Sequence, residues 1–203
     1  MRIGIDIKAF KNGTTGIARM LRSIMDELQL IDTRNEYVLF EPCPCGYRPE
    51  NPRWRVRTVP WKLPGVLWQQ FVLPFALRGE SIDCLWAPEQ SCPLYFMKNV
   101  RIITTFHDLV YIHFPHTCQL STRLILRLLT PGVLRRSDLV HTVSHTIADD
   151  VARTYRHAGI REKIVPIANG RPDWHLPAGY SAKNREDYLF FAGNIEPRKN
   201  IGH

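Results

Sequence analysis

Residues 1–31 read MRIGIDIKAFKNGTTGIARMLRSIMDELQLI and predict a strand, a glycine-containing loop and a helix, in that order. From Arg2 to Ile7 an isoleucine occupies every second position, which is the period of a strand. Turn-forming residues fill 11–16, and from Ile17 to Ile31 apolar residues recur at spacings of three and four, as on one face of a helix. This opening is typical of an α/β unit.

The same alternation of elements continues to about residue 170. Short runs rich in β-branched and aromatic residues predict strands, and the apolar stretch 120–134 predicts a helix. The predicted strands are residues 37–40, 54–59, 102–106, 139–143 and 163–167. Strands that alternate with helices form βαβ units, so we expect an α/β fold with a Rossmann-like, doubly wound, mainly parallel sheet. Ligands bind such sheets outside the carboxyl ends of the strands.

The composition is that of a folded protein with a basic surface. The chain has 203 residues, 27 Lys and Arg against 19 Asp and Glu, and a formal net charge of +8. Residues 45–80 carry six basic and two acidic side chains, and residues 120–163 carry eight and four. A basic surface suits phosphate-bearing ligands, an anionic membrane or nucleic acid, and composition does not choose among them.

The five cysteines and the lack of a long apolar run indicate in which cellular compartment the protein is expected. The cysteines are odd in number and have no repeated CxxC spacing, so neither a disulfide framework nor a zinc site is indicated, and the close pair Cys43 and Cys45 stays a weak metal candidate. No uninterrupted apolar run of about 18 residues or signal peptide is present. We therefore expect a cytoplasmic protein, with a charge compatible with peripheral contact at the inner face of a membrane.

Two glycines after the first predicted strand are candidates for binding a phosphate or sugar. Gly13 and Gly16 precede the first helix, where backbone N–H groups are free and no side chain obstructs a ligand. The alternative is that they serve only the turn. The spacing is not the G-x-G-x-x-G of dinucleotide folds, so a nicotinamide cofactor is disfavoured.

His107 and Asp108 follow the predicted strand 102–106 directly and are candidates for the cleft. A histidine there can donate or accept a hydrogen bond or a proton, and an adjacent carboxylate can orient it. The alternative is a loop histidine bonded to the backbone. No two histidines of the chain have the two-His-plus-acid spacing of a zinc helix.

Three further polar residues follow strands. Ser144 can present its hydroxyl to a ligand or cap the next helix, and capping is favoured. Arg198 and Lys199 follow a strand-like run and a turn, where two cations beside a helix start can hold a diphosphate. The alternative is a solvated pair of charges.

Eight stretches of the chain occur in the order of one family. They are ID (5–6) with TGIAR (15–19), LWQQ (67–70) with LP (73–74), DCLWAP (83–88), TTFHDL (104–109) with Pro115, RRSD (135–138), TVS (142–144), KIVPIANG (163–170) and FAGNIEPRKN (191–200). The chain resembles the family 4 (group 1) glycosyltransferases, retaining enzymes of GT-B architecture that use nucleotide-sugar donors.

The resemblance implies two Rossmann-like domains, the first for the acceptor and the second for the nucleotide sugar. It implies an acceptor domain over 1–170, a linker over 171–186, and the start of the second domain over 187–203, so that the 203-residue chain alone is expected to be inactive. It assigns Gly16 to the donor phosphates, His107 to the transferred sugar, and Arg198 with Lys199 to the donor diphosphate. Asn194 departs from the family, many members of which carry an arginine there. No metal or other cofactor is implied.

The implied function is transfer of a hexose, with retention, to a glycan or lipid-linked acceptor in cell-envelope polysaccharide synthesis. The alternative is an inert module that binds a glycan or an anionic surface. Nucleic acid is not expected as a partner, because the basic residues lack interleaved aromatics or a reading motif. A surface of Arg53, Arg55, Arg57 and Lys62 with Leu63, Val66, Leu67, Trp68 and Phe71 either contacts a lipid headgroup layer or is the core face of a helix.

Overall fold

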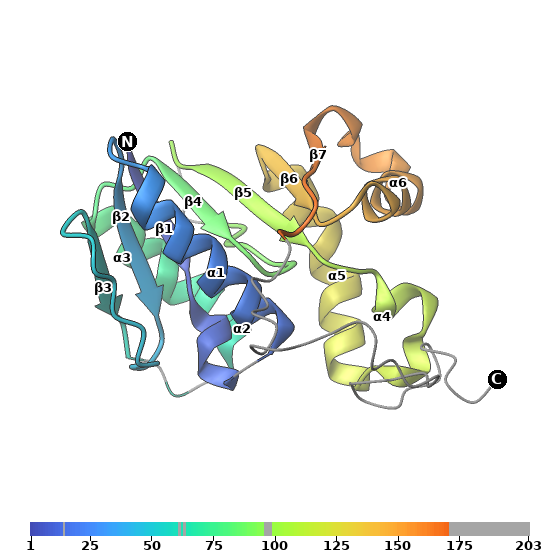
Figure 1. The fold of residues 1–203 in the computed structure, drawn as a ribbon. Helices are drawn as coiled ribbons and strands as arrows, with labels where there is room; N and C mark the ends of the chain where they lie inside the picture. Colours follow the sequence, from blue (N-terminus) through green and yellow to red (C-terminus); the bar gives the residue numbers. More distant parts are fainter. Residues whose placement is uncertain (14, 61, 63, 96–98, 171–203) are drawn as a thin grey trace, which may run out of the picture.

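A seven-stranded parallel sheet organises the part of the chain that the computed structural model describes, residues 1–13, 15–60, 62, 64–95 and 99–170 (Figure 1). The strands are β1 (Arg2–Asp6), β2 (Glu36–Glu41), β3 (Trp54–Thr58), β4 (Cys84–Ala87), β5 (Arg101–Phe106), β6 (Leu139–Thr142) and β7 (Ile164–Pro166). Their order in the sheet is β3-β2-β1-β4-β5-β6-β7, and every neighbouring pair is parallel. This confirms the expected Rossmann-like α/β class.

Helices connect the strands and cover the sheet. The longer ones are α1 (Gly16–Ile31), α3 (Leu73–Gly79), α5 (Leu120–Arg136) and α6 (His145–Thr154), and the short ones are η1 (Lys8–Asn12), α2 (Gly65–Leu67), the π-helical η2 (Trp68–Val72), α4 (Val110–His113), η3 (Pro115–Thr117), η4 (Arg156–Ala158) and η5 (Arg161–Lys163). Within the described residues, none of these helices combines the length and hydropathy that a bilayer span requires.

Alternating side chains of the strands send the core to both faces of the sheet. Leu39 packs with Leu21 of α1 in one buried cluster, whereas its neighbour Phe40 packs with Leu77 of α3 in another. Figure 1 shows α1 on one face and α3 on the other. A third cluster joins β5 and β6 to α5 and α6. Helices on both faces make the sheet doubly wound, and alternate strand residues are therefore buried on opposite faces.

The predicted strands agree with the observed ones to within one residue at either end, and the predicted helix 120–134 extends to Arg136. β4 lies in a segment for which the sequence pattern predicted no element, and the π-helical turn η2 contains Trp68 and Phe71, for which a helix was one of the two alternatives. The linker and second-domain predictions, including Arg198 and Lys199, fall on residues 171–203, outside the described part of the chain.

The strand order reverses between β1 and β4, since the chain builds β2 and β3 to one side of β1 and β4 to β7 to the other. In open α/β sheets this reversal opens a crevice at the carboxyl ends of the two central strands. Here those ends are Asp6 of β1 and Ala87 of β4.

Candidate functional site

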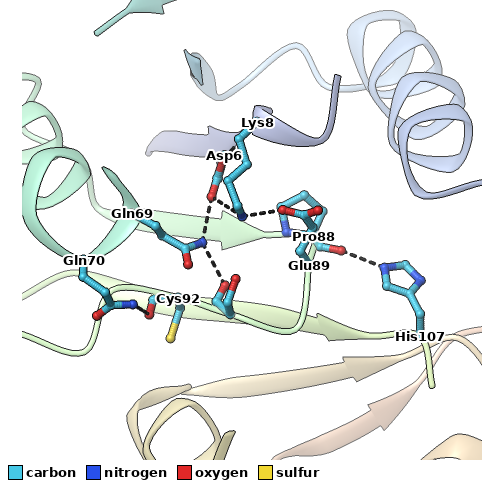
Figure 2. Close-up of polar contacts among 9 residues, drawn as sticks. Asp6, Lys8, Gln69, Gln70, Pro88, Glu89, Cys92 and His107 are labelled. Atoms are coloured by element: carbon cyan, nitrogen blue, oxygen red, sulfur yellow. Dashed lines mark hydrogen bonds and ion pairs between the residues drawn. The ribbon is translucent and has the colours of Figure 1, made fainter. Parts of the chain in front are cut away.

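A cluster of charged side chains lies at the carboxyl ends of β1 and β4. Asp6, the last residue of β1, has no exposed side-chain surface and accepts hydrogen bonds through Oδ1 from the Lys8 backbone N–H (3.0 Å) and through Oδ2 from Lys8 Nζ (3.0 Å). Lys8 Nζ also pairs with Glu89 Oε2, from the loop after β4 (Figure 2). Burial lowers the pKa of Lys8, but the charges of Asp6 and Glu89 outweigh that effect and hold the pKa above its ordinary value.

Two glutamines from η2 fasten the loop after β4 to the same cluster. Gln69 Nε2 donates to Asp6 Oδ2 (2.8 Å) and to the carbonyl of Ser91 (3.1 Å). Gln70 Nε2 donates to the carbonyl of Cys92 (2.8 Å), and Gln70 Oε1 accepts from the backbone of Leu94 (3.0 Å). Both glutamines are buried, together with Trp68, in the π-helical turn η2.

The orientation of the Gln69 amide follows from its partners. A carboxylate and a carbonyl can only accept, so the nitrogen of the amide must face them. Gln69 Oε1 is buried and has no hydrogen-bond partner within the described residues. This oxygen is an unused acceptor next to the charged cluster.

His107 lies at the mouth of the same edge, directly after β5, and its ring is tied to the loop after β4. His107 Nε2 lies 2.7 Å from the carbonyl oxygen of Pro88 (Figure 2). A carbonyl only accepts, so Nε2 carries the proton and Nδ1 of the neutral ring is left with its lone pair. His107 can therefore accept a hydrogen bond from a ligand hydroxyl through Nδ1.

Asp108 takes a different role from the orienting one that its sequence position suggested. Its Oδ1 accepts from the backbone N–H of Val110 (3.1 Å), at the start of α4. The partner that orients His107 is instead the Pro88 carbonyl, and the described part of the chain contains no hydrogen bond between His107 and Asp108. The reason is local, because the chain turns into α4 and Asp108 satisfies an unpaired N–H there.

The glycine loop lies after η1, at the carboxyl side of β1. Gly13 has a φ of 74°, a left-handed conformation that favours glycine. Thr15 caps α1, with Oγ1 accepting from Ala18 N at 3.2 Å, and Gly16 begins the helix. Among the described residues, a Cβ added at Gly16 would meet no heavy atom within 4 Å beyond its chain neighbours and its own helix backbone, so these residues leave the space in front of the helix open. The first-turn N–H groups of Gly16 and Ile17 have no intrahelical acceptor.

Ser144 is the N-cap of α6. Its Oγ accepts from Ile147 N at 3.2 Å, as the capping interpretation predicts. The hydroxyl is thus already engaged in the helix start, and a contact with a ligand would have to use its remaining capacity.

A second chain of polar side chains links β4 to the segment after β7. Trp86 Nε1 donates to Thr105 Oγ1 (3.0 Å), Thr105 Oγ1 lies 3.1 Å from His141 Nδ1, and His141 Nε2 lies 3.1 Å from the carbonyl of Ile167. The carbonyl requires a proton on Nε2, so Nδ1 accepts from the Thr105 hydroxyl. Burial lowers the pKa of His141 despite the hydrogen bond to Ile167, and a proton on both nitrogens of His107 would lower it further.

The cysteines show no cluster that would hold a metal. Within the described residues no group of three or more His, Cys, Asp or Glu side chains is placed to bind a cation. Cys45 Sγ donates to Glu41 Oε2 at 2.6 Å, and burial together with that carboxylate raises the pKa of Cys45 to about 12. Cys45 is therefore a poor metal ligand or nucleophile at neutral pH.

The residues between 53 and 71 that were predicted either to contact lipid or to form the core face of a helix are partly buried and partly exposed. Trp68 is fully buried and donates through Nε1 to the carbonyl of Val59, so it belongs to the core. Arg55 and Arg57 both pair with Glu80, while Leu67 and Phe71 are exposed. Leu63 lies outside the described residues.

Sequence reasoning missed four of these functional candidates: Asp6, Lys8, Gln69 and Glu89. The rule that ligands bind after strand ends could have found Asp6 and Lys8, which end and follow the first predicted strand. Glu89 had no such signal, because its strand β4 was not predicted. Gln69 lies in a π turn, and hydrophobic periodicity does not predict π turns.

Comparison with protein families gives one match. The family model described as Glycosyltransferase Family 4 matches residues 15–172, which include Gly16, Gln69, Glu89 and His107. Comparison with curated proteins gives no match.

Proposed function

The chain belongs to glycosyltransferase family 4, a family that implies a nucleotide-sugar donor and an acceptor, and we propose that residues 1–170 form the acceptor side of a retaining hexose transfer. The observation that carries this proposal is the hydrogen bond from His107 to the loop after β4, because the same loop carries Glu89 of the charged cluster at the strand-order reversal. The acceptor is a glycan or a lipid-linked sugar.

His107 contacts the transferred sugar in this proposal. Nδ1 is the lone-pair nitrogen and faces no hydrogen-bond partner within the described residues, so it accepts a hydrogen bond from a sugar hydroxyl. Such a bond orients the sugar, and orientation of reacting groups accounts for much of the rate in transfer reactions.

The N-terminus of α1 receives the donor phosphates. α1 spans 16 residues, and its first-turn N–H groups carry the partial positive charge of the helix dipole. Gly16 keeps side-chain bulk out of the space that a phosphate would enter. Arg198 and Lys199 are proposed to neutralise the same diphosphate, which stabilises the leaving nucleotide electrostatically without a metal.

A lipid-linked acceptor would bring the protein to a membrane surface, and α5 offers a suitable contact. Leu120, Leu124 and Leu128 follow at intervals of one helical turn and are 61%, 49% and 77% exposed. Exposed Arg127 lies on the same helix. Apolar side chains beside a cation are the pattern that binds an anionic lipid interface.

A transfer assay tests the function. The 203-residue chain, and a version extended by a second α/β domain, are incubated with labelled nucleotide-diphosphate hexoses and with glycan or lipid-linked acceptors. We expect transfer by the extended protein and a product whose anomeric configuration, read by NMR, matches that of the donor. Robust transfer by the 203-residue chain alone would refute the need for a second domain. An inverted product would refute retention.

The inert-module alternative predicts a different pattern. If the extended protein transfers no sugar although the chain binds glycans or anionic vesicles, the proposal is overturned in favour of a binding module. The same assay with a His107→Ala variant separates transfer at this cleft from contaminating activity, because only transfer at this cleft depends on His107.

A further inference from the structure

We infer that Lys8 and Glu89 are positioning residues that hold the Pro88 carbonyl in place and thereby keep the proton of His107 on Nε2. They act on His107 through the loop after β4, not by direct contact with a ligand. This inference rests on the proposed function for the importance of His107, but its structural part can be tested without any sugar transfer.

The loop after β4 is fastened at two points directly after its contact with His107. Glu89 directly follows Pro88 and pairs with Lys8 Nζ, which is itself held by Asp6 Oδ2 at 3.0 Å. Two residues further on, the Ser91 carbonyl accepts from Gln69 Nε2 at 3.1 Å. The loop therefore has little freedom to turn the Pro88 carbonyl away from His107.

Of the contacts that hold the loop after β4, the Lys8–Glu89 ion pair lies nearest to Pro88. The Lys8 side chain is 15% exposed and that of Glu89 27%, so water screens their attraction only in part. Lys8 lies after β1 and Glu89 after β4, so their pair bridges the two strands that flank the strand-order reversal. The ion pair thus connects the ends of β1 and β4 to the Pro88 carbonyl, which determines the tautomer of His107.

The consequence for His107 is a defined hydrogen-bonding polarity. The proton on one ring nitrogen is fixed by the hydrogen bond that this nitrogen makes. With the Pro88 carbonyl held 2.7 Å away, Nε2 carries the proton and Nδ1 accepts. If the loop is released, water replaces the carbonyl, and both neutral tautomers become populated. Part of the protein would then present a donor to the sugar where an acceptor is required.

Nitrogen-15 NMR of the histidine side chains in the 203-residue protein tests the inference. The His107 signals are assigned by their loss in a His107→Gln variant. In the wild type, under conditions where the ring is neutral, we expect a single Nε2–H tautomer. In Glu89→Ala we expect a mixture of both tautomers, whereas Glu89→Gln retains an acceptor for Lys8 and restores the single tautomer.

Matched controls separate positioning from general destabilisation. Glu36→Ala removes another ion pair, to Arg2 at the amino end of the sheet, and should leave the His107 tautomer unchanged. If Glu89→Ala does not fold, the double variant Lys8→Met/Glu89→Leu removes both members of the pair together and is expected to give the same mixture. An unchanged single Nε2–H tautomer in the folded Glu89→Ala or double variant overturns the inference.

Transfer assays distinguish this inference from the proposed function. In the extended protein, Glu89→Ala should lower the transfer rate by about 10- to 100-fold, the cost of a misplaced contact group, and Glu89→Gln should recover most of it. If the tautomer mixes as expected while transfer never depends on His107, the positioning role stands and the proposed function fails. If transfer depends on His107 but the tautomer does not respond to Glu89, the positioning role fails.

Discussion

The Nε2 atom of His107 lies 2.7 Å from the carbonyl oxygen of Pro88, so the segments that follow the neighbouring strands β5 and β4 are joined across the carboxyl edge of the sheet. This hydrogen bond leaves Nδ1 as the ring atom available to a ligand. It also links His107 to the charged cluster, because Pro88 precedes Glu89 in the same loop.

Replacing His107 by glutamine tests the role of Nδ1. The glutamine amide can still donate to the Pro88 carbonyl but offers no acceptor at the position of Nδ1. We expect a free energy of unfolding within about 1 kcal/mol of the wild type and a transfer rate lower by about tenfold or more, since one net hydrogen bond is worth about 1.5 kcal/mol. Denaturant unfolding and the transfer assay measure the two effects, with exposed His116→Gln as the control. Full activity in His107→Gln would exclude a contact through Nδ1.

The Gly16→Ala variant tests whether the glycine loop binds a ligand or serves only as a turn. Among the described residues, the added Cβ would contact no atom within 4 Å beyond its chain neighbours and its own helix backbone. Alanine favours the helix over glycine by up to about 1 kcal/mol, so the protein should be as stable as the wild type or more stable. Transfer should nevertheless fall, because the methyl group enters the space for the donor phosphates. Gly65→Ala, at the start of α2, is the matched control and should retain activity. Unchanged transfer in Gly16→Ala would leave the glycine loop with only a turn role.

The lowered pKa of His141 predicts that the protein loses stability in mild acid. Burial holds its pKa in the folded protein below 6.5, so as the pH falls below 6.5 the unfolded chain takes up a proton that the folded protein does not. The free energy of unfolding then decreases with falling pH, by up to about 1.4 kcal/mol per pH unit, until the pKa of the folded state is reached. In His141→Gln this part of the slope between pH 7 and pH 5 should disappear, while exposed His116→Gln should keep it. Parallel slopes for the wild type and His141→Gln would contradict the prediction.

The α5 surface predicts binding to anionic vesicles. The double variant Leu124→Glu/Leu128→Glu replaces two exposed leucines by acids and should abolish flotation with vesicles that contain anionic lipid, because both apolar contact and charge attraction are lost. Leu30 is 75% exposed on α1, and Leu30→Glu is the control that should still float. Circular dichroism melts should agree among the three proteins. Equal flotation of the double variant would place any membrane contact elsewhere.

The fold follows from local patterns in the sequence, and its site depends partly on contacts that those patterns do not contain. The alternation of Ile3, Ile5 and Ile7 and the helical spacing after Ile17 predict β1 and α1, because each pattern reports which side chains are buried. β4 has only four residues, Cys84–Ala87, and is too short for a period to stand out. Without β4 the strand-order reversal could not be located.

The candidate site shows the same division. His107 and Gly16 could be found because they follow predicted strands or loops in sequence. Glu89 and Gln69 join the site through long-range contacts, Glu89 with Lys8 and Gln69 with Asp6, 63 residues away. Gln69 and Gln70 of η2 also bind the loop after β4. Contacts between segments so far apart in the chain leave no trace in the periodicity of a single sequence.

Asp6→Asn tests whether the charged cluster holds the cleft together. The Asp6 side chain has no exposed surface and accepts three hydrogen bonds, two from Lys8 and one from Gln69. An asparagine must turn an NH2 group toward one of these donors, and it removes a charge that compensates buried Lys8. Breaking a buried ion pair from one side costs about 3 kcal/mol, so the melting temperature should fall by roughly 10 °C. Glu36→Gln weakens the exposed pair with Arg2, in which Glu36 is 54% exposed, and should cost less than about 1 kcal/mol. Calorimetry measures the melting temperatures of the two variants. If Asp6→Asn melts at the same temperature as Glu36→Gln, the cluster contributes little to the stability of the domain.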